Sequence, residues 1–298
     1  MLPDPRTPHV AAYNPTFDPE LVRRALAEDI GRGDVTTEAT IPAGARTSAR
    51  IVARQAGVVA GLPVAELAFR LLDPTATFEV LAAEGKPVEA GTTLVRVVGD
   101  TRALLSAERT ALNFLGHLCG IATLASRCVA AVASTRAEIV DTRKTTPGLR
   151  ALEKYAVRTG GAHNHRGGLD DGILIKDNHI AAAGGVRQAI ERARLHASHL
   201  LKIEVECEDE QQVSDAVESG ADVILLDNMP LDRLRANVAW IHTHVPGTLI
   251  EASGGIGTDP DRLRAVAETG VDLISLGALT HSAPHLDVAL DFEPAPTF

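Results

Sequence analysis

Aromatic residues are scarce in this sequence: they make up 3% of its 298 residues, although 45% of the residues are hydrophobic. The core must therefore consist mainly of Ala, Val, Leu and Ile, a composition common in α/β proteins with parallel sheets. Cysteine is also rare. Cys119, Cys128 and Cys207 form no CxxC pair, and their spacing fits no metal site. We expect buried free thiols in a reducing compartment.

Two further absences concern location. Residues 1–18 contain four prolines and lack the apolar segment of a signal peptide, so the sequence predicts a flexible lead-in there. No uninterrupted apolar run approaches the roughly 20 residues that span a bilayer. We therefore expect a cytoplasmic protein with no membrane partner.

The charge is unevenly distributed. The net charge of -10 disfavours nucleic acid and acidic membranes as partners. Residues 136–180, however, hold eight Lys and Arg against six acidic residues, so this stretch carries +2 and the remainder -12. A small anionic substrate would have to bind at this locally basic stretch.

The first part of the chain predicts an α+β domain. Residues 20–30 have the pattern of an amphipathic helix that ends at glycine. Short β-like segments follow between 47 and 99, with one helix at 64–73, which indicates a mixed or antiparallel sheet. A long helical pattern at 101–132 is apolar on most faces, so we expect it to be buried or to lie in an interface.

A different rhythm begins at residue 138. Apolar runs alternate with helical patterns, which is typical of parallel strands with crossover helices. No GxGxxG motif follows an early strand, so an incomplete (β/α) barrel is favoured over a Rossmann fold, with catalytic groups at the carboxyl ends of its strands. We expect an α/β sandwich at 1–130 and the barrel at 131–280, with 281–298 a candidate to pack back on the sandwich. The six apolar runs are 138–144, 172–178, 202–208, 222–228, 247–255 and 272–278.

Cationic side chains follow the first two strands of the predicted barrel. Arg143 and Lys144, beside the hydroxyl of Thr145, could grip a carboxylate or phosphate. Lys176 ends the next apolar run and would point at the barrel mouth, where a Schiff-base role is an alternative.

A glycine-flanked segment lies between these strands. His165 and Arg166 stand in it, and we expect them to recognise an anion. Metal binding by His163 and His165 is the weaker alternative, because Arg166 beside them would repel a cation.

Later strand ends carry acidic and small residues. Glu206 and Asp227 could bind Mg²⁺ directly or through water, hydrogen-bond ribose hydroxyls, stabilise a positive transition state, or pair with the cations nearby. The small residues of the last two strand ends could bring backbone N–H groups against a phosphate. These are Ser253, Gly254 and Gly255, and then Gly277, Ala278 and Leu279.

Together these motifs resemble the quinolinate phosphoribosyltransferase family over about residues 20–290. The resemblance rests on ERTALNFLGHLCGIAT, DTRKTTPGLRALEKYAVRTGGAHNHRGGLDDGILIKDNH, IEVECE, VILLDN, EASGGI and SLGALTHS. It implies transfer of phosphoribose from phosphoribosyl pyrophosphate to quinolinate with loss of CO₂, in NAD biosynthesis, by a Mg²⁺-dependent homodimer.

The resemblance also implies roles for single residues. Arg109, in itself an ordinary helix arginine, would reach into the partner subunit's site. Lys144, Lys176, Glu206 and Asp227 would be catalytic, with the two acids on the ribose and Mg²⁺ side. The 5′-phosphate would lie against Ser253–Gly255 and Gly277–Leu279, and quinolinate among Arg143, Lys144, His165, Arg166 and Lys176.

Two other functions remain open at this point. One is a related phosphoribosyltransferase of molybdate-linked gene clusters, which the complete cationic set disfavours. The other is a pyridine-metabolite sensor that binds without turnover, although the sequence contains no attached DNA-binding or signalling module.

Overall fold

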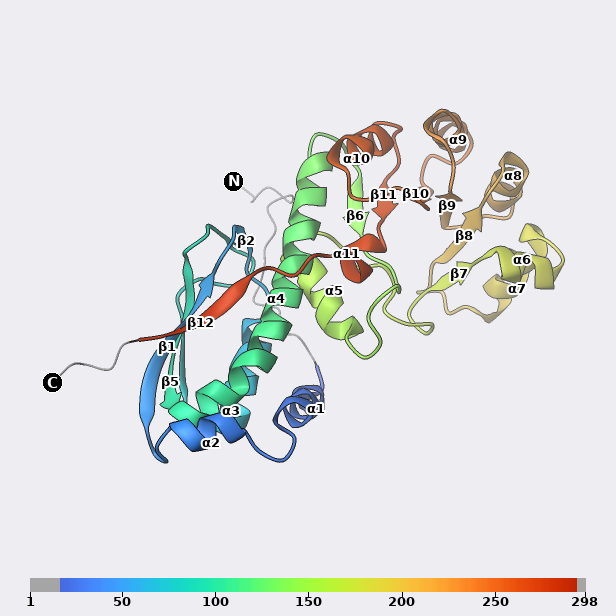
Figure 1. Ribbon diagram of the computed structural model, residues 1–298. Coiled ribbons are helices and arrows are strands. Elements are labelled where there is room, and N and C mark those ends of the chain that lie inside the picture. Colours follow the sequence, from blue (N-terminus) through green and yellow to red (C-terminus); the bar gives the residue numbers. More distant parts are fainter. Residues whose placement is uncertain (1–16, 294–298) are drawn as a thin grey trace, which may run out of the picture. The chain divides into compact units, whose positions relative to one another are not determined.

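The structure is a computed structural model that describes residues 17–293, so nearly all of the predicted lead-in 1–18 lies outside the described residues. The chain divides into two compact units (Figure 1). Of the described residues, the first comprises 17–126, 146–161 and 283–293, and the second 127–145 and 162–282. We expected one boundary, at residue 130, but the chain crosses between the two units several times. Residues 146–161, which we expected in the barrel, cluster with the first unit.

The first unit contains an antiparallel sheet in the order β12-β1-β5-β3. Strand β12, from the C-terminal part of the chain, pairs with β1 at the edge of this sheet. We named 281–298 as a candidate to pack on this unit, and β12 does so as an edge strand. A two-stranded ribbon, β2 and β4, accompanies it. The strands are β1 (Arg46–Ala53), β2 (Gly57–Val58), β3 (Thr77–Val80), β4 (Pro87–Val88), β5 (Thr93–Asp100) and β12 (Val288–Phe292).

The shorter helices of the first unit begin and end at recognisable residues. Asp18 caps α1 by accepting the N–H of Glu20, and Gly31 ends that helix with φ 56°. Asp34 caps the next helix by accepting the N–H of Thr37. These helices are α1 (Pro19–Ile30), α2 (Val35–Thr40), α3 (Leu62–Leu72) and α5 (Arg150–Thr159).

The long helix α4 (Thr101–Val132) has the bounds that the sequence predicts. Its middle, residues 118–123, is buried on every face, and toward its ends the buried residues, such as Leu104 and Leu115, form a stripe. By length and composition α4 could cross a membrane, although polar residues interrupt its apolar ones. It is weak evidence for a span, because 67% of its most apolar window is buried, as in the core helix of a soluble protein.

The second unit contains a six-stranded sheet in the order β6-β11-β10-β9-β8-β7, with every described pairing parallel. This confirms the predicted α/β class with a parallel sheet beside an antiparallel domain. Strands β6 and β7 end the order, and no pairing between them occurs within residues 17–293. The strands are β6 (Glu138–Val140), β7 (Ile173–Ile175), β8 (Ile203–Cys207), β9 (Val223–Asp227), β10 (Leu249–Ser253) and β11 (Leu273–Ser275).

Crossover helices connect these strands, as the β–α rhythm predicts. Side chains alternate between the two faces of each strand. In β8, Ile203, Val205 and Cys207 are fully buried on one face, and Glu204 and Glu206 share the other. The helices are α6 (Asp177–Ala183), α7 (Val186–His196), α8 (Glu210–Glu218), α9 (Leu231–His244), α10 (Pro260–Ala267) and α11 (Ala278–His281).

Close packing in the first unit leads to a stability prediction. A Cβ atom at Gly120 of α4 would overlap the backbone carbonyl of Pro284, and one at Gly116 would lie 2.8 Å from that of Leu286. We expect Gly120→Ala to lower the free energy of unfolding by about 1–3 kcal/mol, as overpacking does. Urea denaturation measures the change. Gly247→Ala is the control, because nothing lies within 4 Å of that Cβ position; equal effects at both positions would contradict the prediction.

Candidate active site

The predicted site residues of the second unit stand along one edge of its sheet. Because the strands are parallel, their carboxyl ends meet at the same edge. One predicted site residue follows or ends each strand. The strand order brings residues that are far apart in the sequence next to one another along this edge. From β6 to β7 the positions are Lys144, Gly277, Ser253, Asp227, Glu206 and Lys176.

Lys176 and Glu206 form an ion pair at the β7–β8 side of this edge. The Lys176 Nζ donates to Glu206 Oε2, and the two side chains are 43% and 13% exposed. Lys176 also opens α6, where its backbone N–H donates to His179 Nδ1 at 3.0 Å. An ammonium group held by a carboxylate is a poor nucleophile, so the pairing disfavours the Schiff-base alternative. It suits a lysine that exchanges one anionic partner for another.

Asp227 and Ser253 are register partners on β9 and β10. The next residue, Asn228, takes the left-handed conformation with φ 52°, and its Nδ2 donates to Asp227 Oδ2 at 2.6 Å. Its backbone N–H donates to Ser253 O at 3.0 Å. A Cβ at Gly254 would lie 2.5 Å from the Asn228 side chain, so only glycine fits there. Asn228 therefore fixes both strand ends, a role that the sequence reading missed.

Lys144 lies beside the segment that was predicted to hold a phosphate. A Cβ at Gly277 would come within 3.0 Å of Lys144 Cδ. Thr280 Oγ1 donates to the backbone carbonyl of Lys144 at 2.8 Å, which ties the two loops together. Leu279 is fully buried, so only its backbone could contact a ligand. The cation and the small residues are thus adjacent at the β6–β11 side.

Arg143 and Arg166 form a second group of cations. Arg143 Nη1 donates to Gly168 O at 3.4 Å, and Arg166 Nη1 to Gly172 O at 3.1 Å. Burial, and then the neighbouring Arg143 cation, lower the pKa of Arg166 below its usual value. Two guanidinium groups this close repel each other, and a bound carboxylate would relieve the repulsion.

The Asp171 carboxylate holds the glycine loop that carries Arg166. Its two oxygens accept the N–H groups of Gly167 and Gly168 at 2.6 and 2.9 Å. The buried carboxylate of Asp141 holds the residues just before this loop. It accepts hydrogen bonds from Asn164 Nδ2 at 2.6 Å and from the His165 N–H at 2.9 Å. Both acids are missed site residues. Asp141 stood in the quoted DTRK motif, and its place after a buried strand was the available signal.

His165 uses both of its ring nitrogens within the protein. Nδ1 accepts the Arg166 N–H at 2.7 Å, and Nε2 lies 2.9 Å from Glu204 Oε2. We expected His165 to recognise an anion together with Arg166, and this arrangement suits a histidine that orients Arg166. His163 turns elsewhere, with its Nε2 3.7 Å from Glu138 Oε2, so the two histidines do not converge on a shared metal.

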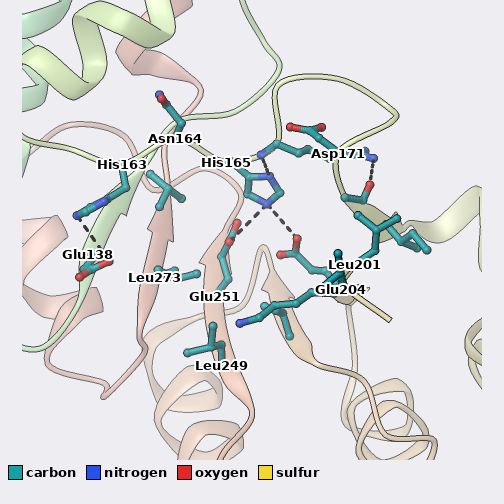
Figure 2. A pocket seen from close by; sticks show the side chains of 17 residues that line it. Glu138, His163, Asn164, His165, Asp171, Leu201, Glu204, Leu249, Glu251 and Leu273 are labelled. Carbon is teal, nitrogen blue, oxygen red and sulfur yellow. Dashed lines mark hydrogen bonds and ion pairs between the residues drawn. The ribbon is translucent and has the colours of Figure 1, made fainter. Parts of the chain in front are cut away.

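A cavity of about 700 Å³ lies inside the second unit (Figure 2). It is lined by the first residues of several strands, and of the predicted site residues it includes only His165 and Arg166. Glu204 and Glu251 face His165 there, and the three ligand atoms lie within 4.8 Å of one another. Burial, and then Glu204, raise the pKa of Glu251 to about 8. The sequence reading named neither carboxylate as a site residue.

Arg109 belongs to the first unit, on an exposed position of α4. Its neighbour Glu108 has a raised pKa because of burial, which the Arg109 cation partly opposes. The role of Arg109 in a partner subunit's site stays a prediction.

Comparison with known proteins gives a family for both units. The description "Quinolinate phosphoribosyl transferase, N-terminal domain" matches residues 34–119, and the C-terminal domain of the same family matches 121–291. A probable nicotinate-nucleotide pyrophosphorylase [carboxylating] of Synechocystis is 46% identical over 92% of both chains. The Mycobacterium leprae enzyme of that name is 44% identical over 91% of this chain and 96% of its own.

A solved structure agrees with these relatives. The nicotinate-nucleotide pyrophosphorylase of Francisella tularensis superposes with a TM-score of 0.86 at 36% identity, covering 92% of this chain and 95% of that one. The strand order, the polar strand-end edge and both domain matches therefore lead to one conclusion. This chain belongs to the quinolinate phosphoribosyltransferase family.

Proposed function

We propose that this protein transfers phosphoribose from phosphoribosyl pyrophosphate to quinolinate, yielding nicotinate mononucleotide, pyrophosphate and CO₂. The observation that carries the proposal is the carboxyl edge of the parallel sheet, where lysines stand at both sides and acids between them. Both substrates are multiply anionic, and a protein of net charge -10 needs such a concentrated cationic site to bind them. Family membership supports the same reaction.

Quinolinate would bind through its two carboxylates. Arg143 and Arg166 suit one of them, because paired guanidinium groups bind a carboxylate with directed hydrogen bonds. Lys176 suits the other, as it can leave Glu206 for a stronger anionic partner. His165 acts indirectly by orienting Arg166. The ring nitrogen would then face the ribose carbon that it attacks, and such positioning contributes much of the rate enhancement.

The phosphoribosyl group would lie across the middle of the edge. Ser253–Gly255 and Gly277–Leu279 offer backbone N–H groups to its 5′-phosphate, and Lys144 adds a charge beside Gly277. Glu206 and Asp227 would face the ribose, where their negative charge favours an oxocarbenium-like transition state. After transfer, the pyridinium nitrogen beside the 2-carboxylate stabilises the carbanion left by CO₂ loss, so the chain need supply no electron sink.

Magnesium is the proposed cofactor. Glu206 and Asp227 are carboxylates on neighbouring strands, and Mg²⁺ is commonly held by one or two carboxylates, with water and substrate phosphates completing its shell. The donor set therefore fits Mg²⁺. When bound, the ion would supply charge neutralisation for the departing pyrophosphate.

Three broader statements belong to this proposal. The protein would act in the cytoplasm. It would bind neither nucleic acid nor membranes, because of its negative charge. It would work as a homodimer in which Arg109 of each subunit completes the other's site.

The first test is the reaction itself. Purified protein with quinolinate, phosphoribosyl pyrophosphate and Mg²⁺ should release CO₂ and nicotinate mononucleotide in equal amounts. Arg143→Ala should lower kcat/KM by about 30- to 1000-fold, the size of losing about 2–4 kcal/mol of charged contacts. Arg264→Ala, an exposed helix residue paired with Asp261, is the control and should change nothing. Binding of quinolinate without turnover would instead support the sensor alternative.

A second test concerns the subunit interface. Arg109→Ala and Lys176→Ala homodimers should each be nearly inactive. Mixed dimers should regain activity, because one of their two sites then carries both native residues. The measurement is the specific activity of co-expressed, doubly tagged heterodimers. Heterodimers as inactive as the parents would place Arg109 outside the partner's site.

A third test concerns the metal. Chelation should abolish product formation, and added Mg²⁺ should restore it. In Asp227→Asn the Mg²⁺ concentration for half-maximal activity should rise by about tenfold or more, as expected for a weakened ligand set. Asp232→Asn is the matched control on the exposed start of α9. An unchanged Mg²⁺ requirement in Asp227→Asn would remove that residue from the metal site.

A further inference from the structure

Two glutamates are buried side by side in the second unit with oxygens that nothing in the described chain satisfies. Glu204 is 7% and Glu251 1% exposed. Both oxygens of Glu251, and Oε1 of Glu204, lack a partner with hydrogen-bond geometry among residues 17–293, although the side chains of Ser275 and Glu204 lie near enough to Glu251 to affect its pKa. Figure 2 shows both side chains directed toward His165. The ligand atoms of the two carboxylates lie within 4.8 Å of each other. Two buried carboxylates this close cannot both ionise without a large cost in free energy, so a positive charge or a proton must compensate them.

His165 is an unsuitable source of that charge. Its Nδ1 accepts the Arg166 backbone N–H at 2.7 Å and so carries no proton in this arrangement. In this arrangement Nε2 is the nitrogen that donates to Glu204 Oε2 at 2.9 Å, and the effect of His165, which lowers the pKa of Glu251, is smaller than the effects of burial and Glu204 that raise it. Glu251 Oε2 lies farther from Nε2, at 3.7 Å. The other charged or titratable groups lining this cavity are Glu138, His163, Arg166, Asp171 and Lys202.

Arg166 is the cation that His165 connects to the two glutamates, and it already interacts with other groups of the protein. Its Nη1 donates to Gly172 O, and its positive charge interacts with Glu204 and Asp171 as well as with the neighbouring Arg143. The remaining way to neutralise the carboxylate pair is a proton on Glu251, which is the more buried of the two and lacks the His165 hydrogen bond. Burial and the Glu204 charge accordingly raise the pKa of Glu251 to about 8.

We propose that Glu251 is a positioning residue of the quinolinate site: as a neutral acid it leaves Glu204 alone to orient His165, which in turn fixes Arg166. This inference rests on the proposed function, because that function assigns Arg166 to a substrate carboxylate. When Glu251 loses its proton to solvent, its carboxylate competes with Glu204 for the His165 Nε2–H, because Glu251 Oε2 lies 3.7 Å from that nitrogen. The imidazole then turns away from Glu204, its Nδ1 no longer accepts the Arg166 N–H, and the orientation of Arg166 is lost.

The protonated state also links folding to pH. The folded chain holds a proton on Glu251 that an unfolded chain, with an ordinary value of 4.5, has released. The folded state therefore binds more protons between 4.5 and about 8, and the free energy of unfolding falls as the pH rises through this window. A glutamine at the same position cannot ionise and removes this dependence.

The test compares the wild type with Glu251→Gln from pH 6 to 9.5. The wild-type KM for quinolinate should rise above pH 8, by about tenfold per unit if one proton is lost, with a smaller change in kcat. The Glu251→Gln variant should keep a flat KM and gain thermal stability over the wild type as the pH rises. Glu138→Gln, the same change at a more exposed acid of this cavity, should behave as the wild type.

Infrared spectroscopy of the wild type keeps the proposal testable if Glu251→Gln does not fold. A buried protonated carboxyl band should be present at neutral pH and vanish above pH 9. Its absence at neutral pH would overturn the proposal, as would an alkaline rise in KM that Glu251→Gln retains.

A metal ion bound by the two glutamates and His165 would also overturn the proposal. Metal analysis should find no stoichiometric zinc or manganese in the wild type, although His165, Glu204 and Glu251 are close enough to share an ion. A metal lost on Glu251→Gln would make the trio a metal site instead. If Arg166→Ala leaves the quinolinate KM unchanged, the proposed substrate contact fails, whereas the infrared band still reports separately on Glu251.

Discussion

The site depends on one constraint, the common direction of the six strands in the second unit. Parallel hydrogen bonding from β6 through β11, β10, β9 and β8 to β7 brings all carboxyl ends to a single edge. Lys144 and Lys176, separated by 32 positions in sequence, thereby stand at the two sides of this edge with Asp227 between them. Each crossover helix returns the chain to the amino side before the next strand begins. A single reversed strand would remove its polar end from the site.

Several carboxylates in this unit hold the segments that carry the cationic side chains in place. Asp141 and Asp171 hold loop backbones, and Glu204 holds an imidazole. Their hydrogen bonds are made inside the protein, so the loops bearing Arg143 and Arg166 are ordered before an anion arrives. Ordering in advance reduces the entropy that binding must overcome. The excess of acidic residues in the chain is thus compatible with a cationic site.

The sequence predicted the fold where the pattern was long and regular. The helix at 101–132 and six apolar runs with polar ends reappear in the structure, because burial period and strand-end polarity are local properties. Contacts that depend on distant partners were not predictable. The sequence reading selected Glu206, yet Glu204 lies on the same face of β8 two residues earlier, and only the approach of β10 and His165 gives it a role. Asn228 was read as part of VILLDN, but its positive φ arises from the backbone of β10.

The pairing of β12 with β1 has a consequence for biosynthesis. The sheet of the first unit contains one strand, Val288–Phe292, that leaves the ribosome after every residue of the second unit. Residues 127–282 can therefore begin to fold while the outer edge of β1 still lacks its neighbour. An uncovered strand edge is a template for association with other chains. Pairing with β12 thus closes a strand edge that would otherwise be open to association with other chains.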